Sequence, residues 1–241
     1  MQRLLEATVR AERDHFWFQG FRRFVAPLLT RAGGGRSASI LLDCGFGTGT
    51  NLTLLESWGR AFGVELEPAG LRFARSAGHT RIARATVTRL PFADAAVDVV
   101  TSFDVLYCLT DPDEEQAIRE MYRVLRPGGH ALINVAALPV LRGNHSILGG
   151  ELRRYTRPQL RAHVQQAGFE ILRLTYTNAV LLPVMVPVRL AQRLAGLHMP
   201  DGDLAEITVP PPPAPRRARS LLPRNRRSAR SGRAPARRQA R

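Results

Sequence analysis

The chain has 241 residues and a formal net charge of +15 at pH 7. That length is enough to bury one sizeable core and requires no second domain. Residues 210–241 contain eleven arginines and no acidic residue, so the remaining body carries a net charge of only +4. This distribution argues against a basic nucleic-acid-binding body, and we expect any binding through the tail to be weak, unspecific and salt-sensitive.

The cysteines and the N-terminus favour a cytoplasmic protein. Cys44 and Cys108 are far apart and have no metal-ligand spacing, so the sequence predicts neither a disulfide framework nor a metal site. Residues 1–18 mix charges of both signs without a long apolar run, unlike a secretory signal. The apolar part of residues 179–194 is about half the length that spans a bilayer, so no transmembrane segment is expected.

Residues 1–31 are predicted to be helical, and Gly33, Gly34 and Gly35 separate them from the rest of the chain. The helical region carries the cluster His15-Phe16-Trp17-Phe18, which suits either packing or a stacked ligand. We therefore divide the chain into a helical lid at 1–38 and a catalytic domain at 39–209.

The central region alternates short β-rich runs with amphipathic stretches, a pattern typical of βαβ units. The strands predicted from it cover residues 40–43, 61–65, 81–85, 97–103, 130–136 and 169–176. A helix is predicted to begin at a cap on Asp111 and to pack the face formed by Ala117, Ile118, Met121, Val124 and Leu125 on the sheet. The fold class is α/β, with a Rossmann-like, mostly parallel sheet and helices on both of its faces.

Residues 210–241 are rich in Pro, Arg and Ala and lack hydrophobic periodicity, so we predict that they are disordered. Two hypotheses explain their composition: a native disordered tail, or the product of a shifted reading frame in a GC-rich gene.

The strongest functional signal is ILLDCGFGTGTN at residues 40–51, where an acid precedes three glycines. A dinucleotide fingerprint would place its third glycine at position 50, which here is Thr50. S-adenosylmethionine (SAM) has no phosphate, and Asp43 suits its ammonium group directly or through water. Gly45, Gly47 and Gly49 let the backbone approach a ligand closely.

Glu65 ends the second predicted strand, where a carboxylate can accept both ribose hydroxyls of an adenosine. Dinucleotide enzymes use an acid at similar spacing, so Glu65 supports a ligand that contains adenosine but does not distinguish SAM from a dinucleotide. The glycine order makes SAM the predicted cofactor. An NAD(P)-dependent oxidoreductase and a SAM-binding protein without catalysis remain as alternatives.

The body resembles the class I SAM-dependent methyltransferases, in particular the type 11 group that includes the ubiquinone/menaquinone-biosynthesis enzymes. The resemblance covers roughly residues 12–194. It rests on LLDCGFGTGT, GVELEP, RLPFADAAVDVVTSFDVLY, YRVLRPGGHALINV and RRYTRPQLRAHVQQAGFEILRL, in that order.

This resemblance implies a methyl transfer from SAM to an acceptor that the sequence does not identify, which we expect to be a small molecule. It implies that Asp43 and the three glycines line the methionine end and that Glu65 lies at the ribose. It also implies that Thr86 and Val87 flank the adenine and that Ser102 and Phe103 lie beneath the cofactor.

The chain departs from the family pattern at three places. Thr86 stands where an acid is usual, and the run from Asp104 to Cys108 lacks the histidine that often follows there. The arginine-rich tail cannot supply the hairpin that provides a seventh strand, so we expect that strand to be missing.

Three residues are candidates for activating or orienting the methyl acceptor. His145 follows the fifth predicted strand and is the first choice for a general base, although a solvent-exposed loop histidine explains it equally well. Tyr107 and Tyr155 are candidates for orienting an acceptor through their hydroxyls, although a buried tyrosine that bonds to backbone is the commoner case.

Overall fold

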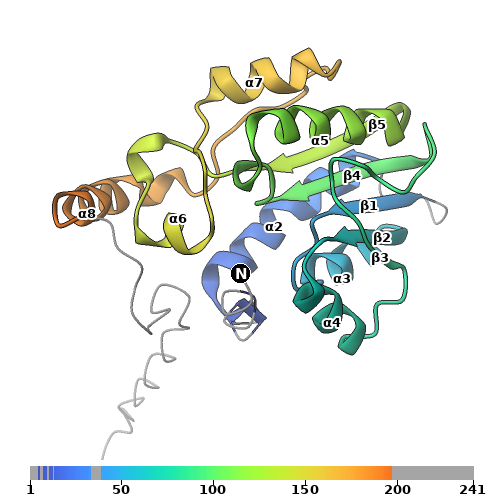
Figure 1. Cartoon of the computed structure of the whole chain (residues 1–241), viewed down its shortest axis with the longest axis horizontal. Helices are drawn as coiled ribbons and strands as arrows, with labels where there is room; N and C mark the ends of the chain where they lie inside the picture. The colour runs from blue at the N-terminus through green and yellow to red at the C-terminus, as the bar shows by residue number, and fades with distance from the viewer. Residues whose placement is uncertain (1–4, 6–7, 10, 13, 34–38, 197–241) are drawn as a thin grey trace, which may run out of the picture. The chain divides into compact units, whose positions relative to one another are not determined.

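The computed structural model describes residues 5, 8–9, 11–12, 14–33 and 39–196 (Figure 1). The predicted tail at 210–241 and most of the first fifteen residues of the predicted lid lie outside this range. The described part contains one five-stranded parallel sheet of order β3-β2-β1-β4-β5. Its strands are β1 (Ile40–Cys44), β2 (Arg60–Glu65), β3 (Ile82–Arg84), β4 (Val97–Phe103) and β5 (Leu125–Asn134).

Helices cover both faces of this sheet, which confirms the predicted α/β class (Figure 1). The longer helices are α2 (Phe16–Arg31), α3 (Thr50–Glu56), α4 (Pro68–Ser76), α5 (Asp111–Val124), α7 (Arg157–Gln166) and α8 (Leu182–Leu194). Shorter ones are η1 (Leu106–Cys108), η2 (Pro139–Leu141), α6 (Asn144–Leu148) and η3 (Ala179–Leu181).

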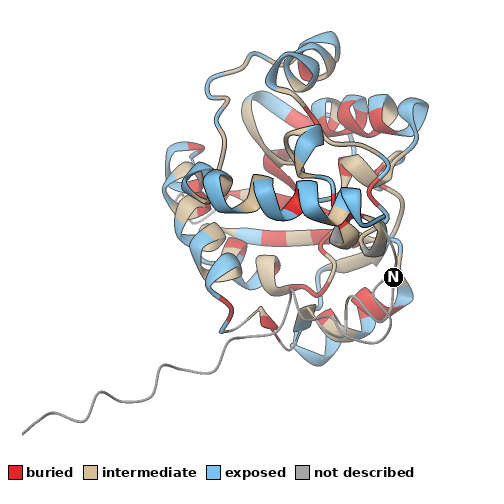
Figure 2. Ribbon diagram, turned by 90° about the vertical axis from the view of Figure 1, so that its left-hand side faces the viewer, coloured by how far each residue is buried: buried red, intermediate tan, exposed pale blue. Residues whose placement is uncertain are grey.

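Side-chain alternation along the central strands builds a separate core on each face, because successive residues of a strand point to opposite sides. Leu42 and Val100 pack with the apolar face of α5, as the sequence predicts. Leu41 and Val99 pack on the other face with α2, α3 and part of α4. The buried residues of the strands and of the inner helix faces are red in Figure 2.

The strand order reverses between β1 and β4. From β1 the chain moves outward through β2 and β3, and it then returns to place β4 on the free side of β1. In open α/β sheets, ligands bind outside the carboxyl ends of the strands at such a switch point. Asp43 lies there, paired in register with Thr101 of β4.

Three details of the predicted elements are wrong. Residues 169–176 form no strand: Phe169 and Ile171 pack on the core as a strand pattern predicts, but the described residues show no ladder hydrogen bonds for this segment. β5 begins at Leu125 instead of residue 130, because residues 125–129 already run along β4 with a register shift. The N-cap of α5 is Thr110, and Asp111 is its first helical residue.

The apolar helix α8 packs against η2 and η3 and leaves much of its surface exposed (Figure 2). Its exposed side chains include Val184, Val188 and Leu194. No helix in the described ranges is long and apolar enough to cross a membrane.

Candidate functional site

The glycine-rich loop leaves β1 through three residues in the left-handed region, with φ of +82° at Gly45, +55° at Gly47 and +90° at Gly49. A Cβ on Gly49 would lie 2.9 Å from the Cβ of Ala74, so the third glycine allows the start of α3 to pack against α4. Gly45 and Gly47 border a cavity of about 1980 Å³, while Gly49 does not. The loop therefore offers its backbone to the cavity mainly at the first two glycines.

Asp43 is almost completely buried at the carboxyl end of β1. Its Oδ1 accepts a hydrogen bond from Thr101 Oγ1 at 2.7 Å, while Oδ2 is buried with no partner among the described residues. Burial raises the pKa of this carboxyl to about 7, the Thr101 hydrogen bond lowers it, and the charge of Glu65 raises it further. An ammonium group, directly or through a bridging water, would supply the donor that Oδ2 lacks.

Glu65 is held by three backbone N–H groups. Its Oε2 accepts from Gly47 at 2.8 Å, and its Oε1 accepts from Leu66 at 2.8 Å and Glu67 at 2.9 Å. A carboxylate offers about four acceptor positions, so one remains for a ligand. Glu65 lines the cavity, and it also fixes the loop that would hold the other end of the same ligand.

The residues predicted to surround the adenine and to lie beneath the cofactor occupy two environments. Thr86 and Val87 line the cavity, and the Thr86 hydroxyl bonds to the Thr88 hydroxyl at 2.8 Å. Phe103 also lines it and meets Phe21 of α2 edge to face at 5.0 Å. Ser102 is fully buried, and its Oγ has no partner among the described groups.

Glu12 contributes to the site although no sequence motif selects it. Its Oε2 accepts hydrogen bonds from Thr48 Oγ1 at 2.6 Å and Thr50 Oγ1 at 2.5 Å, and Arg22 donates to its backbone oxygen at 2.8 Å. Burial raises the pKa of Glu12, and these two hydroxyls oppose that effect. The N-terminal segment is thereby attached to the glycine-rich loop through a contact that spans 36 residues of chain.

Helix α2 supports the same side of the cavity. His15 caps it by accepting a hydrogen bond from the Trp17 backbone N–H at 3.2 Å, and the His15 ring stacks on Phe16. Val25 and Leu29 lie in the core, so the second half of α2 belongs to the packed body. The aromatic cluster borders the cavity, and a lid function for residues 1–38 stays a prediction.

A second polar group lies at the carboxyl ends of β4 and β5. Asp104 faces the cavity, and its Oδ1 accepts a hydrogen bond from Asn134 Nδ2 at 2.9 Å. Asp104 is an exposed residue that lines the cavity. The protein packed around its carboxyl raises the pKa to about 6, while the Asn134 hydrogen bond and the charge of Arg154 lower it. In the sequence this segment is notable only for lacking a histidine, so Asp104 was not among the predicted site residues.

The three predicted acceptor-site residues lie in different surroundings. Tyr107 is half-buried and lines the cavity, where burial and the charge of Asp104 raise its pKa. His145 lies in α6, and its side chain is outside the described part of the structure. The Tyr155 hydroxyl is buried beside Glu114 and Arg153, and burial raises its pKa, so an acceptor would reach it only if its surroundings moved.

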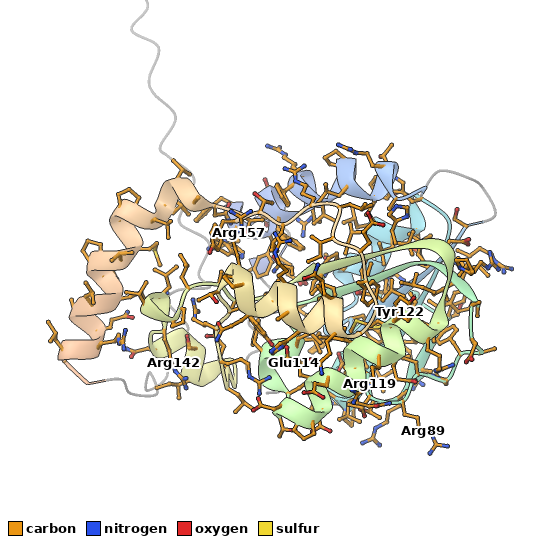
Figure 3. All side chains as sticks on the ribbon, turned by 90° about the horizontal axis from the view of Figure 1, so that it is seen from above. Arg89, Glu114, Arg119, Tyr122, Arg142 and Arg157 are labelled. Carbon is orange, nitrogen blue, oxygen red and sulfur yellow. The ribbon has the colours of Figure 1, made fainter. Side chains whose placement is uncertain are left out.

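Those surroundings are an ion-pair network between α5 and α7. Glu114, which is 1% exposed, pairs with Arg153 and with His163 Nδ1 at 2.7 Å, and the Tyr155 ring lies edge-on to His163. Figure 3 shows Glu114 between these two helices. His163 is half-buried in this network, and His79 is buried against Thr53 and Glu56.

Comparison with known proteins agrees with this geometry. A family model described as a methyltransferase domain matches residues 42–133. Over 115 residues the chain is 36% identical to an Encephalitozoon cuniculi protein named as a methyltransferase, covering 47% of this chain and 50% of the relative. Over 189 residues it is 28% identical to the ubiquinone/menaquinone biosynthesis C-methyltransferase of Klebsiella pneumoniae, covering 63% of this chain and 74% of the relative.

A solved structure of a SAM-dependent methyltransferase from Mesorhizobium loti shares the fold, with a TM-score of 0.53 and 19% identity. That match covers 69% of this chain and 92% of the other. The chain thus spans half the length of the first relative and about three quarters of the second.

Proposed function

We propose that this chain, whose residues 42–133 match a family model described as a methyltransferase domain, binds SAM and transfers its methyl group to a small acceptor. The observation that carries the proposal is the buried Oδ2 of Asp43, which receives no hydrogen bond from a described residue and lies beside a glycine-rich loop at the β1/β4 switch point. A cofactor with an ammonium group at one end and a ribose at the other fits Asp43 and Glu65 together.

In this proposal each group of the site has one task. Asp43 holds the ammonium group, and the backbone of Gly45 and Gly47 forms the floor beside it. Glu65 accepts a hydrogen bond from the ribose, while Thr86 and Val87 flank the adenine. Ser102 and Phe103 support the cofactor from below.

SAM, when bound, supplies a methyl group on a positively charged sulfur that leaves as a neutral thioether. The protein therefore has mainly to place the attacking atom of the acceptor on the methyl axis and to exclude water, which makes positioning the largest contribution to rate. Phe21 and Phe103 contact each other and line the cavity at the end of β4, where that placement would occur.

The cavity favours an acceptor with a large apolar part. At about 1980 Å³ it exceeds the roughly 300–1,000 Å³ of an ordinary small-ligand site, so cofactor and acceptor can share it. The cavity is lined by Phe16, Trp17, Phe18 and Phe24 of α2 and by Leu138 and Leu141 in the chain after β5. Similarity to a protein named for ubiquinone and menaquinone biosynthesis supports the same class.

Two measurements test the proposal. Calorimetry should show that the product S-adenosylhomocysteine binds and that NAD does not; the reverse result would favour the oxidoreductase. The protein should then be incubated with methyl-tritiated SAM and an organic extract of small molecules. Tritium in an extractable product supports transfer, and S-adenosylhomocysteine binding without any transfer favours a SAM-binding protein that does not catalyse.

A further inference from the structure

Asp104 has a positive φ, a backbone conformation that is uncommon for residues other than glycine. Its φ is +62°, in the left-handed region that only a few per cent of non-glycine residues adopt. Aspartate adopts this region more readily than most non-glycine residues, and residues with such uncommon backbone conformations cluster at functional sites. Here the Asp104 N–H donates to the backbone oxygen of Asn134 at 3.0 Å, while the Asn134 amide donates to Asp104 Oδ1. Main chain and side chain are thus both fixed to the end of β5.

This double attachment leaves Oδ2 of Asp104 with no hydrogen bond from any described residue, on a side chain that faces the cavity. The carboxylate follows Phe103 directly, at the switch point where the cofactor would place its reactive end. One oxygen is therefore held and the other can accept a hydrogen bond from a ligand.

The groups around Asp104 keep it ready to accept a proton near neutral pH. Tyr107 and Cys108 approach from η1, and Glu151 and Arg154 approach from the segment after α6. Arg154 is bound to Glu151 through Nε at 2.8 Å, so its charge is shared and only partly stabilises the Asp104 carboxylate. A general base is most effective when its pKa lies near the working pH, and that of Asp104 is about 6.

We propose that Asp104 is the catalytic base for the acceptor and that the attacking atom of the acceptor therefore carries an ionisable proton, as a hydroxyl or phenol does. The inference rests on the proposed function. As the acceptor atom bonds to the methyl carbon, the methyl–sulfur bond breaks and its electron pair stays on sulfur. The acceptor proton passes to Oδ2 of Asp104 and is released to solvent after the product leaves.

The position of Asp104 can be tested without knowing the acceptor. Sinefungin is an analogue of S-adenosylhomocysteine in which a carbon bearing an ammonium group replaces the sulfur, so it places a positive charge where the methyl group would be. We expect the wild-type protein to bind sinefungin about tenfold or more tighter than S-adenosylhomocysteine, because a charge-assisted hydrogen bond forms with Asp104. This preference should fall as the pH is lowered through about 6.

The decisive variant is Asp104→Asn, because asparagine has the same shape and also tolerates positive φ. It should bind S-adenosylhomocysteine as the wild type does and lose the preference for sinefungin. Asn134→Ala removes a hydrogen bond that stabilises the ionised carboxylate, so it should move the loss of preference to higher pH. Asp111→Asn, at a carboxylate whose side chain is 88% exposed, is the charge-matched control and should leave the preference unchanged.

An equal preference in the wild type and Asp104→Asn would overturn the proposed position. Failure of the wild type to bind either ligand would instead overturn the proposed function. In the tritium assay we expect Asp104→Asn to slow labelling by about 100-fold or more, and undiminished labelling would overturn the role as base.

Discussion

The Oε2 atom of Glu65 lies 2.8 Å from the backbone nitrogen of Gly47 and accepts its hydrogen bond. The acid at the end of β2 therefore holds the middle of the loop that follows β1. This joins the two parts of the proposed cofactor site, because a change at the ribose end also alters the loop at the methionine end.

Glu65→Ala should weaken S-adenosylhomocysteine binding by about 2–3 kcal/mol, since it removes a charged acceptor and releases the Gly47 N–H. Calorimetry measures the change. Glu115→Ala removes an exposed carboxylate that pairs with Arg119 and should leave the dissociation constant unchanged. An unaltered constant in Glu65→Ala would remove Glu65 from the site.

Gly70→Ala tests whether the close approach of α4 to the glycine-rich loop is needed for stability and cofactor binding. A Cβ there would lie 2.4 Å from the backbone oxygen of Gly47 and 2.9 Å from Glu65 Cγ, so the loop must shift. We expect a loss of stability of about 1–3 kcal/mol and weaker cofactor binding. Gly20→Ala, in α2 with no atom within 4 Å of the added Cβ, should instead raise stability by about 0.5–1 kcal/mol. Thermal unfolding measures the stability of both variants, and an equal change in the two would contradict the predicted close contact at Gly70.

Gly47→Val should also abolish tight binding of the cofactor, mainly because of its backbone conformation. Among the described residues, a Cβ at Gly47 meets Leu5 Cδ2 at 3.7 Å, but φ is +55°, which valine rarely adopts. Titration with SAM measures the loss, and full affinity in this variant would reject the loop assignment.

The sequence specified the parts of the site that are local in the chain. A strand, an acid and three spaced glycines predict the loop, and the next strand with a terminal acid predicts Glu65. The sequence did not identify Asp104 or Glu12 as site residues. Asp104 is positioned by its hydrogen bond with Asn134, and Glu12 by its hydrogen bonds with Thr48 and Thr50. These partners are distant in the chain, and no motif links them. The predicted strand at 169–176 failed for a related reason. Alternation predicts burial of Phe169 and Ile171, but a strand also needs ladder hydrogen bonds to a neighbour.

Glu12→Ala tests the proposed lid. It removes the acceptor shared by the Thr48 and Thr50 hydroxyls, so the N-terminal segment should detach more readily from the loop. We expect faster amide hydrogen exchange at residues 45–51 and S-adenosylhomocysteine affinity lower by about 1–2 kcal/mol. Asp14→Ala, at an exposed neighbouring acid, is the matched control. Unchanged exchange and affinity in Glu12→Ala would show that the segment does not cover the site.

The pKa of Asp43, raised to about 7 by burial, predicts the direction of two pH effects. The folded protein holds the Asp43 proton more tightly than the unfolded chain, so ionisation of Asp43 lowers stability as the pH rises from about 4 to about 7. Binding of an ammonium group favours the ionised carboxylate, so cofactor affinity should rise over the upper part of this range. Below the pKa, we expect the affinity to rise by at most about tenfold per pH unit. Calorimetry between about pH 5.5 and about pH 8.5 measures this rise. Asp43→Asn should bind weakly at every pH, and an equally steep profile in that variant would exclude Asp43.

Deletion of residues 210–241, which lie outside the described part of the chain, should leave the dissociation constant for S-adenosylhomocysteine unchanged. The tail has almost no large apolar groups to offset the entropy of ordering about thirty residues, so it is expected to make no lasting contact with the site. Its eleven arginines should nevertheless give the full chain a weak, salt-dependent affinity for DNA that the deletion removes. Filter binding at increasing salt, compared with calorimetry on the same two proteins, separates these effects. If the deletion abolished S-adenosylhomocysteine binding, the tail would have to form part of the fold.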